Sequence, residues 1–284
     1  MANWDLKNHT ASVMSSADFN RLSSFIYTHY GIKLPLTKKT MLEGRLHKRL
    51  SALKLTGFKA YCDYLFSTEG QRLELTSMID LVTTNKTDFF REAAHFDFLT
   101  RDVLPKLFKE QHSKPFKIWS AGCSTGEEPY TMAMVLSEFG ANNPGFNYDI
   151  FATDISTRVL ESAITAVYQE EKVLPIPLGY KKKYLLKSKD ARNRTVRIVP
   201  ELRSKVSFGR LNFIDGDFSN IPAFNAVFCR NVLIYFDRET QEKVIRKLAS
   251  KIEKGGFLFL GHSESVSGMD LPLTQVQPAI FKKI

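Results

Sequence analysis

The chain has 284 residues, an apolar fraction of 43% and a formal net charge of +10. This length suits one large α/β domain and a smaller one, each with its own core. No apolar run approaches the length of a membrane span and the N-terminus lacks a signal-peptide layout, so neither membrane insertion nor secretion is indicated and we expect a cytoplasmic protein. The three widely spaced cysteines lack a C-x-x-C pair and no histidine pair has metal-ligand spacing, so neither disulfides nor a metal site is expected.

The positive charge is unevenly distributed along the chain. Residues 1–85 carry 11 Lys or Arg against 7 Asp or Glu, and residues 86–175 carry 9 against 13. Residues 176–210 carry 11 against 2. Two basic segments therefore flank a mildly acidic one, a distribution that suits either nucleic acid or an acidic protein partner.

Residues 15–82 predict an all-helical domain, preceded by a flexible N-terminus over residues 1–14. Apolar residues at helical spacing mark the first two helices, and residues 58–66 and 73–82 predict further ones. The two apolar stripes are Phe19, Leu22, Ile26 and Tyr30, followed by Gly31, and then Leu42, Leu46, Leu50 and Leu53. Arg45, Lys48 and Arg49 share one face of the second helix. They are candidates for binding an acidic helix of a substrate, and the alternative is an ordinary solvated face.

The segment 81–92, LVTTNKTDFFRE, joins the helical domain to the rest of the chain. Thr83, Thr84 and Asn85 favour a turn, after which Thr87 and Arg91 are spaced to share one face of a predicted helix. An arginine in the first turns of a helix opposes the helix dipole, so a nearby carboxylate is expected as its partner.

The stretch 117–130, KIWSAGCSTGEEPY, predicts a buried strand, a turn of small residues and a helix that begins at Glu127 and Glu128. In nucleotide-binding folds such a turn brings the backbone close to a cofactor. Two carboxylates in the first helical turn would repel a phosphate, whereas S-adenosylmethionine is cationic at its reactive end and has no phosphate. The alternative is a strand-to-helix turn with acidic capping and no ligand.

Further strands follow in the pattern of an α/β sheet. Residues 148–154 end in Asp154, an acid suited either to bind both hydroxyls of a ribose or to cap the next helix. Residues 205–213, 225–231 and 255–264 predict three more strands, and residues 279–284 predict a last strand at the edge. Strands that alternate with helices predict a right-handed, doubly wound sheet.

An insertion at residues 168–204 interrupts this pattern. YLLKS and RTVRIV flank the turn DARN, which predicts two strands of a hairpin. Arg192, Arg194 and Arg197 make this hairpin a basic platform, and its open edge could accept a peptide strand. The alternative is an exposed hairpin that only adds solubility.

Five segments together resemble the bacterial chemotaxis receptor methyltransferases of the CheR type: TTNKTDFFRE, WSAGCSTGEEPY, FATDIS, FCRNVLIYF and LFLGHSES. The resemblance covers nearly the whole chain. It implies a Rossmann-like S-adenosylmethionine-dependent methyltransferase domain over residues 83–284, with a basic antiparallel β-subdomain inserted at 176–204. It also implies transfer of a methyl group to glutamate side chains of chemotaxis receptors during adaptation, which yields glutamate methyl esters and S-adenosylhomocysteine.

The resemblance also implies roles for individual residues. The implied cofactor-binding residues are Asn85, Thr87, Arg91, Gly122, Glu128, Asp154, Asn212, Phe213, Asn231 and Val232. Glu128 and Asp154 would hold the methionine and ribose portions, and the last four residues would border the adenine. Arg91 and Tyr235 would lie nearest the transferred methyl and are the predicted catalytic residues.

The expected partners are acidic helices of the cytoplasmic domain of chemoreceptors, bound through the basic residues of the second helix and the hairpin. A receptor tail peptide is a candidate at the hairpin, although the hairpin reads KSKDARNR where some relatives that hold such a tail carry glycines. Gly122 and Cys123 also stand where relatives often have alanines. We expect a monomer that needs no metal, binds no nucleic acid and does not insert into a membrane.

The chemistry agrees with these residue types. A glutamate carboxylate is ionised at neutral pH, so the enzyme needs no general base and its main task is alignment. Arg91 could orient the carboxylate, and Tyr235 could donate a hydrogen bond to it. One alternative is a nucleic-acid methyltransferase, although residues 230–233 lack the Asn/Asp-Pro-Pro-aromatic loop of many base methylases. The other is a binding module of the same fold without turnover.

Overall fold

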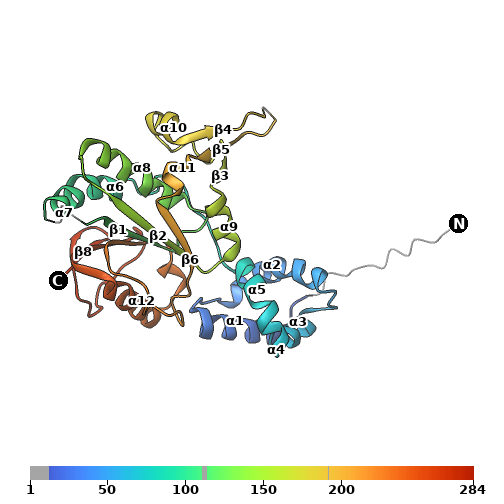
Figure 1. Cartoon of the computed structure of the whole chain (residues 1–284). Helices are drawn as coiled ribbons and strands as arrows, with labels where there is room; N and C mark the ends of the chain where they lie inside the picture. The colour runs from blue at the N-terminus through green and yellow to red at the C-terminus, as the bar shows by residue number, and fades with distance from the viewer. Residues whose placement is uncertain (1–12, 111–113, 191) are drawn as a thin grey trace. The chain divides into compact units, whose positions relative to one another are not determined.

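The computed structural model describes residues 13–110, 114–190 and 192–284. The chain forms two compact units, Met1–Thr84 and Asn85–Ile284, whose helices and strands are labelled in Figure 1. We refer to them as the helical unit and the catalytic unit. Of the N-terminus expected to be flexible, residues 1–12 lie outside the described part, and Met14 is fully buried.

The helical unit contains short helices connected by tight turns. They are α1 (Ser16–Tyr30), η1 (Leu36–Lys38), α2 (Lys39–Ala52), α3 (Phe58–Leu65), α4 (Thr68–Leu73) and α5 (Leu75–Val82). The predicted apolar stripes of α1 and α2 lie in its core except for Leu53, which is half-buried and follows the end of α2. Helix α1 ends at Gly31, which has φ +70°. The helix expected over residues 73–82 begins at Leu75, and α4 precedes it as a separate helix.

The catalytic unit is built on a seven-stranded sheet with the order β6-β2-β1-β7-β8-β10-β9. Its strands are β1 (Phe116–Ala121), β2 (Tyr148–Asp154), β6 (Val206–Arg210), β7 (Phe224–Cys229), β8 (Ile252–Leu260), β9 (Leu273–Gln277) and β10 (Ile280–Lys283). The first five pair with one another in parallel, which confirms the doubly wound sheet, whereas β10 is antiparallel to β8. The prediction that the last strand lies at the edge is wrong, because β10 pairs with both β8 and β9. The edge strand β9, LTQVQ, is mostly exposed and so gave no apolar pattern.

Alternate side chains of the central strands enter two cores on opposite faces of the sheet. Ile118 of β1 packs into one core with the aliphatic residues of α8, whereas Trp119 packs into the other with those of α12. The helices of this unit are α6 (Ala94–Phe98), η2 (Leu99–Val103), α7 (Leu104–Glu110), α8 (Glu127–Asn142), α9 (Thr157–Thr165), α10 (Leu178–Tyr184), α11 (Pro200–Arg203), η3 (Leu233–Tyr235) and α12 (Arg238–Ser250). A sheet covered on both faces explains why its strands read as nearly continuous apolar runs.

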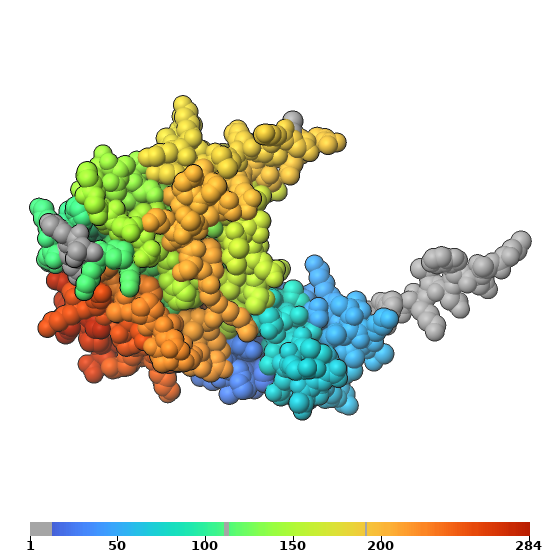
Figure 2. All heavy atoms as spheres, in the orientation of Figure 1, coloured from blue at the N-terminus to red at the C-terminus, as the bar shows by residue number. Residues whose placement is uncertain are grey.

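The insertion between α9 and β6 forms a separate three-stranded antiparallel sheet. β4 (Leu185–Lys187) and β5 (Thr195–Ile198) are the predicted hairpin, and β3 (Val167–Gln169) adds a strand that was not expected. In Figure 2 the hairpin projects from the body of the catalytic unit. Its base is tied to α8, where Glu138 accepts hydrogen bonds from Lys183 at 2.8 Å and Tyr184 at 2.6 Å.

The helix expected to carry Thr87 and Arg91 does not form. Residues 84–88 have no regular structure, residues 89–93 form turns, and α6 begins only at Ala94. Phe90 and Glu92 have φ of +54° and +53°, which a helix does not allow. No helix within the described residues is both long and apolar enough to cross a membrane.

Candidate cofactor site at the ends of the parallel strands

The predicted cofactor residues of the sheet lie where neighbouring parallel strands end. Gly122 follows β1, Asp154 ends β2, Asn212 and Phe213 follow β6, and Val232 follows β7. The register aligns these strands, with Ala121 beside Thr153 and Ser120 beside Phe228. The strand order reverses between β1 and β7, which is where open α/β sheets bind ligands.

The turn after β1 follows a tight path that glycine permits. Gly122 and Gly126 both have φ of +95°. The N–H groups of Gly122 and Cys123 donate to the carbonyl of Thr153 at 2.8 and 2.9 Å, which ties the turn to the end of β2. A Cβ on residue 122 would overlap Cγ2 of Val232, so the turn after β1 and the loop after β7 meet at this glycine.

Asp154 connects the turn after β1 with the start of α9. Its Oδ2 accepts the N–H of Ser124 at 2.8 Å, and its Oδ1 accepts the N–H of Ser156 at 3.0 Å. Ser156 is the N-cap of α9, so the capping role considered for Asp154 is wrong. The Ser124 hydroxyl donates to the carbonyl of Asn85 at 3.0 Å, which brings the predicted Asn85 to the same turn.

Glu128 lies in the first turn of α8, close to the end of β1. Its Oε1 accepts a hydrogen bond from Ser120 at 2.7 Å, and its Oε2 lies 3.4 Å from Nε of Arg230. Burial raises the pKa of Glu128, while the charge of Arg230 and the hydrogen bond from Ser120 oppose that rise. Sequence reasoning selected Glu128 but did not select Arg230.

Arg91 is held by main-chain contacts. Its Nη1 donates to the carbonyl of Lys86 at 3.1 Å, so the carboxylate expected as its hydrogen-bond partner is replaced by a carbonyl. Its charge still acts on Glu128, whose pKa it lowers. The carbonyl of Arg91 accepts a hydrogen bond from Nη2 of Arg230 at 2.5 Å.

Glu264 organises the loop after β7 and was also missed. Its buried carboxylate accepts the N–H groups of Gly261, Asn231, Val232 and Leu233 at 2.6, 3.0, 2.9 and 2.7 Å. Burial raises the pKa of Glu264, and these four N–H groups lower it. Its sequence signal was an acid shortly after a buried strand, within the segment LFLGHSES.

The other predicted residues have the following positions. Asn212 accepts the N–H of Ile214 at 3.1 Å through Oδ1, and the ring of Phe213 packs edge-on against Trp119 at 6.5 Å. Tyr235 is half-buried in η3, just after the loop held by Glu264. The carbonyl of Thr87 accepts a hydrogen bond from Lys172 at 3.5 Å.

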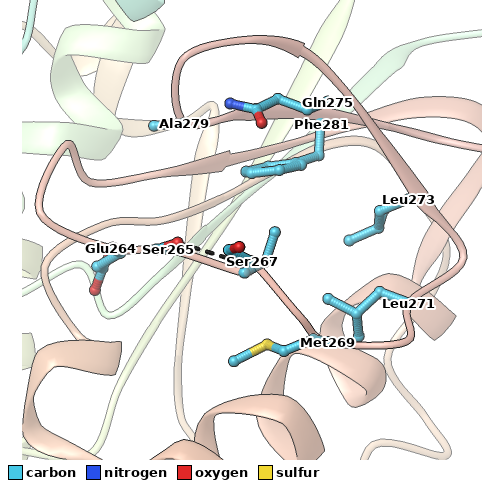
Figure 3. A pocket seen from close by; sticks show the side chains of 10 residues that line it. Glu264, Ser265, Ser267, Met269, Leu271, Leu273, Gln275, Ala279 and Phe281 are labelled. Atoms are coloured by element: carbon cyan, nitrogen blue, oxygen red, sulfur yellow. Dashed lines mark hydrogen bonds between the residues drawn. The ribbon is translucent and has the colours of Figure 1, made fainter.

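A cavity of about 280 Å³ is lined by Glu264 and by the segment that leads to β9 (Figure 3). Its apolar lining includes Met269, Leu271, Leu273 and Phe281. Among the described residues, none of the predicted cofactor ligands lines it, so it is distinct from the predicted cofactor site.

The predicted substrate-binding arginines of α2 have partners inside the helical unit. Nη1 of Arg45 donates to the carbonyls of Val82 and Thr83 at 2.5 and 3.2 Å. Arg49 forms two hydrogen bonds of 2.8 and 2.6 Å with Glu74, whose side chain is 1% exposed. Lys48 is exposed. Two of the three residues therefore stabilise the helical unit, and only Lys48 is exposed. The face is neither fully solvated nor a row of free cations.

The hairpin arginines are more accessible. Arg192 lies 3.3 Å from Asp190 and Arg194 lies 3.4 Å from Glu170, with side-chain exposures of 92% and 76%. Arg197 donates through Nε to the carbonyl of Thr165 at 3.1 Å. At these exposures the two ion pairs stabilise the hairpin little and leave its positive charge facing solvent.

One group of potential metal ligands occurs among the described residues. Atoms of Glu92, His95 and His262 lie within 4.8 Å of one another. Nε of Arg230 lies 3.6 Å from the same carboxylate of Glu92, and its positive charge opposes a cation at this place. The cluster adjoins the segment that carries Arg91.

The fold and the site define an S-adenosylmethionine-dependent methyltransferase. Residues 85–280 match the family model described as the CheR methyltransferase SAM binding domain, and residues 17–83 match the CheR methyltransferase all-alpha domain. The chain belongs to the CheR methyltransferase family, as its sequence motifs predicted.

Curated relatives align along most of the chain. The chemotaxis protein methyltransferase of Borreliella burgdorferi is 39% identical over 272 residues, which is 94% of each chain. That of Escherichia coli K12 is 37% identical over 261 residues, 92% of this chain and 88% of the relative. Chemotaxis protein methyltransferase 2 of Pseudomonas aeruginosa is 36% identical over 249 residues, 87% of this chain and 86% of the relative.

Proposed function

We propose that this methyltransferase transfers the methyl group of S-adenosylmethionine to glutamate side chains of chemotaxis receptors, giving glutamate methyl esters and S-adenosylhomocysteine. The observation that carries the proposal is the match of both units to one methyltransferase family, whose curated relatives here are named chemotaxis protein methyltransferases. The residues at the strand ends support the same chemistry.

In this proposal the cofactor lies over the ends of β1, β2, β6 and β7. Glu128 binds the methionine ammonium, because Glu128 and Glu92 are two carboxylates beside the single guanidinium of Arg230. Asp154 binds the ribose hydroxyls, while Asn212, Phe213, Asn231 and Val232 border the adenine. The glycine turn at residue 122 supports a close approach of the ligand to the backbone. Asn85 and Thr87 complete the pocket from the segment before α6.

When bound, S-adenosylmethionine supplies a methyl group activated by a positive sulfonium. The substrate carboxylate is ionised at neutral pH, so one of its oxygens would form the bond to the methyl carbon without a general base, as the carbon–sulfur bond breaks and S-adenosylhomocysteine leaves. Arg91 orients this carboxylate, and its hydrogen bond to the Lys86 carbonyl limits how tightly it can hold the substrate. Tyr235 lines the transfer site. Alignment of the two reactants then contributes most of the rate enhancement.

The exposed basic residues are proposed to bind the acidic helices of the receptor. Arg192 and Arg194 on the hairpin and Lys48 on α2 present positive charge to solvent. A basic hairpin of this kind also suits a nucleic acid, and the experiment below distinguishes the two substrates.

The decisive experiment incubates the protein with methyl-labelled S-adenosylmethionine and chemoreceptor cytoplasmic fragments, with and without their C-terminal tails. We expect base-labile label on the receptor fragment, as a methyl ester requires. Label that nuclease removes from added nucleic acid would indicate the alternative enzyme. Cofactor binding without label on any fragment would contradict the proposed substrate.

A further inference from the structure

Arg230 is the buried cation of the candidate site and contacts three polar partners on two separate segments. It directly follows β7, and its side chain is only 3% exposed. Its guanidinium reaches Glu128 on α8 at 3.4 Å, Glu92 at 3.6 Å and the carbonyl of Arg91 at 2.5 Å. Its remaining surface covers the rings of Phe96 and Phe228, at 5.5 and 6.0 Å from their centroids.

Among Arg230 and the two carboxylates within 4 Å of its guanidinium, the charges do not balance. One guanidinium lies between two carboxylates, Glu92 and Glu128, which leaves a net charge of about −1 when both are ionised. A buried cluster with one surplus negative charge attracts a single ammonium group. If Arg230 were absent, the two carboxylates would instead repel each other and one would take up a proton.

Among the groups around Glu128, Arg230 is the one that most favours its ionised form. Burial raises the pKa of Glu128 most, and Glu92 also raises it. The charge of Arg230 is the largest effect that lowers this pKa, and the Ser120 hydrogen bond and the charge of Arg91 lower it further. The neighbouring thiols of Cys123 and Cys229 are neutral, because burial raises the pKa of each well above its usual value. His95 is neutral as well, since burial lowers its pKa to about 4.

We propose that Arg230 is a positioning residue for methyl transfer: it orients the Glu128 carboxylate toward the methionine ammonium and fixes the main chain at Arg91. This proposal rests on the cofactor role of Glu128 and the substrate role of Arg91 given above. Arg230 acts on the reactants through these two residues. It couples the two binding positions because one guanidinium contacts both.

The test compares Arg230→Lys and Arg230→Met, with Arg246→Lys on the exposed face of α12 as the matched control. S-adenosylmethionine affinity is measured by calorimetry between pH 5.5 and 8, and kcat and KM are measured with a receptor fragment. We expect Arg230→Met to weaken cofactor binding about tenfold or more. It should also move the loss of affinity on acidification to higher pH, because Glu128 binds a proton more readily without the guanidinium. Arg230→Lys should keep the pH profile near that of the unsubstituted chain but lower kcat, since one ammonium cannot reach all three partners.

Removal of a buried cation can prevent folding, so a charge-balanced variant accompanies the single ones. Arg230→Met with Glu92→Gln retains the cluster charge of about −1 and leaves Glu128 as the single anion. We expect this double variant to fold and to recover most of the cofactor affinity. Its kcat should remain low, because the hydrogen bond to the Arg91 carbonyl is lost.

The outcomes separate this proposal from the proposed function. If Glu128→Gln weakens cofactor binding while Arg230→Met and Arg230→Lys change neither affinity, pH profile nor kcat, the positioning role is wrong and the cofactor site stands. If Glu128→Gln leaves the affinity unchanged, the cofactor role of Glu128 is wrong, and so is the claim that Arg230 orients Glu128 toward the cofactor. If the protein methylates no receptor fragment but the Arg230 variants still show the shifted affinity profile, only the proposed substrate is wrong.

Discussion

Arg230 donates a hydrogen bond to the carbonyl of Arg91, yet the environments of the two side chains differ. Arg230 is almost completely buried among rings and carboxylates, whereas Arg91 is half-buried and its Nη1 donates to a carbonyl. Phe90 and Glu92, the residues on either side of Arg91, both have positive φ, a conformation that costs bulky residues free energy and tends to occur at functional sites. The backbone at Arg91 is therefore held by its surroundings and can present the guanidinium in one direction.

At this scale, Arg91→Ala should lower kcat by about a hundredfold, because a misaligned carboxylate seldom reaches the methyl group in line. Cofactor affinity should change much less, and the comparison of kcat with the calorimetric dissociation constant separates the two effects. Arg101→Ala, an exposed arginine of η2, is the control. An unchanged kcat in the Arg91 variant would remove this residue from the mechanism.

Gly122→Ala should destabilise the catalytic unit by about 2 to 4 kcal/mol, from the positive φ and from overlap with Val232. Val232→Ala in the same chain should relieve the overlap but not the backbone strain. Gly145→Ala is a matched control, because Gly145 has φ +89° and open space around its Cβ position. Urea unfolding measures all three variants, and equal losses at positions 122 and 145 would show that Val232 plays no part.

At the scale of elements, the loop after β7 depends on one side chain. The Glu264 carboxylate accepts the N–H of Gly261 in its own turn and the N–H groups of three consecutive residues of the neighbouring loop. Asn231 at the start of that loop has φ +60°, so the hydrogen bonds offset an unfavourable backbone conformation. The loop that carries two predicted adenine contacts is thus shaped by a residue that is not itself a predicted contact.

Glu264→Gln keeps the shape of the side chain but replaces one acceptor oxygen with an amide. We expect a loss of about 3 kcal/mol in the free energy of unfolding, since two N–H groups lose a charged acceptor. Cofactor affinity should fall with it, as the loop loses its order. Ser263→Ala, an exposed neighbour, should change neither quantity. A variant of full stability and normal affinity would contradict the role given to Glu264.

The basic hairpin is the other element with a testable role. Replacing Arg192, Arg194 and Arg197 with glutamine should raise KM for a receptor fragment several-fold and reduce its dependence on salt, because exposed charges act through screened attraction. Cofactor affinity should stay the same. The charge-matched control replaces three exposed cations with glutamine: Lys243 and Arg246 of α12, and Lys254 near the start of β8. Equal effects of both triple variants would indicate a response to net charge alone.

At the scale of the whole catalytic unit, stability should depend on pH through His95. Burial lowers the pKa of His95 to about 4, the charge of Arg230 lowers it further, Glu92 opposes this, and His262 also lowers it. The folded pKa is thus below the unfolded value of 6.5, so this contribution is complete above pH 6.5 and is lost as the pH falls to about 4.

We expect a loss of up to about 3 kcal/mol from this group over that interval. His95→Gln should flatten this part of the curve of unfolding free energy against pH, even if it lowers stability at pH 7. His29→Gln, an exposed histidine of α1, is the control. An unchanged slope in the His95 variant would show that other groups govern the acid response.

Much of the fold could be predicted because its signals are local. The parallel strands are apolar on both faces, and Gly31 and the turn at Gly122 mark where elements end or change direction. The strand β9 and the helix expected at Thr87 were misjudged because tertiary contacts decide them. Arg230 and Glu264 were missed for a related reason, since a single buried charge has no periodicity and acquires its meaning only from partners distant in the sequence.

A hydrogen bond from the central strand β1 joins two residues far apart in the sequence, and the inserted subdomain lies between them. The N–H of Lys117 donates to the side chain of Asn225, 108 residues further on. The entropy of closing a loop grows only with the logarithm of its length, so the insertion at residues 168–204 adds about 0.4 kcal/mol to the closure cost. Family members could therefore lengthen, shorten or reshape this subdomain with little penalty to the sheet, which makes it a place where partner preference can diverge while the transfer chemistry is retained.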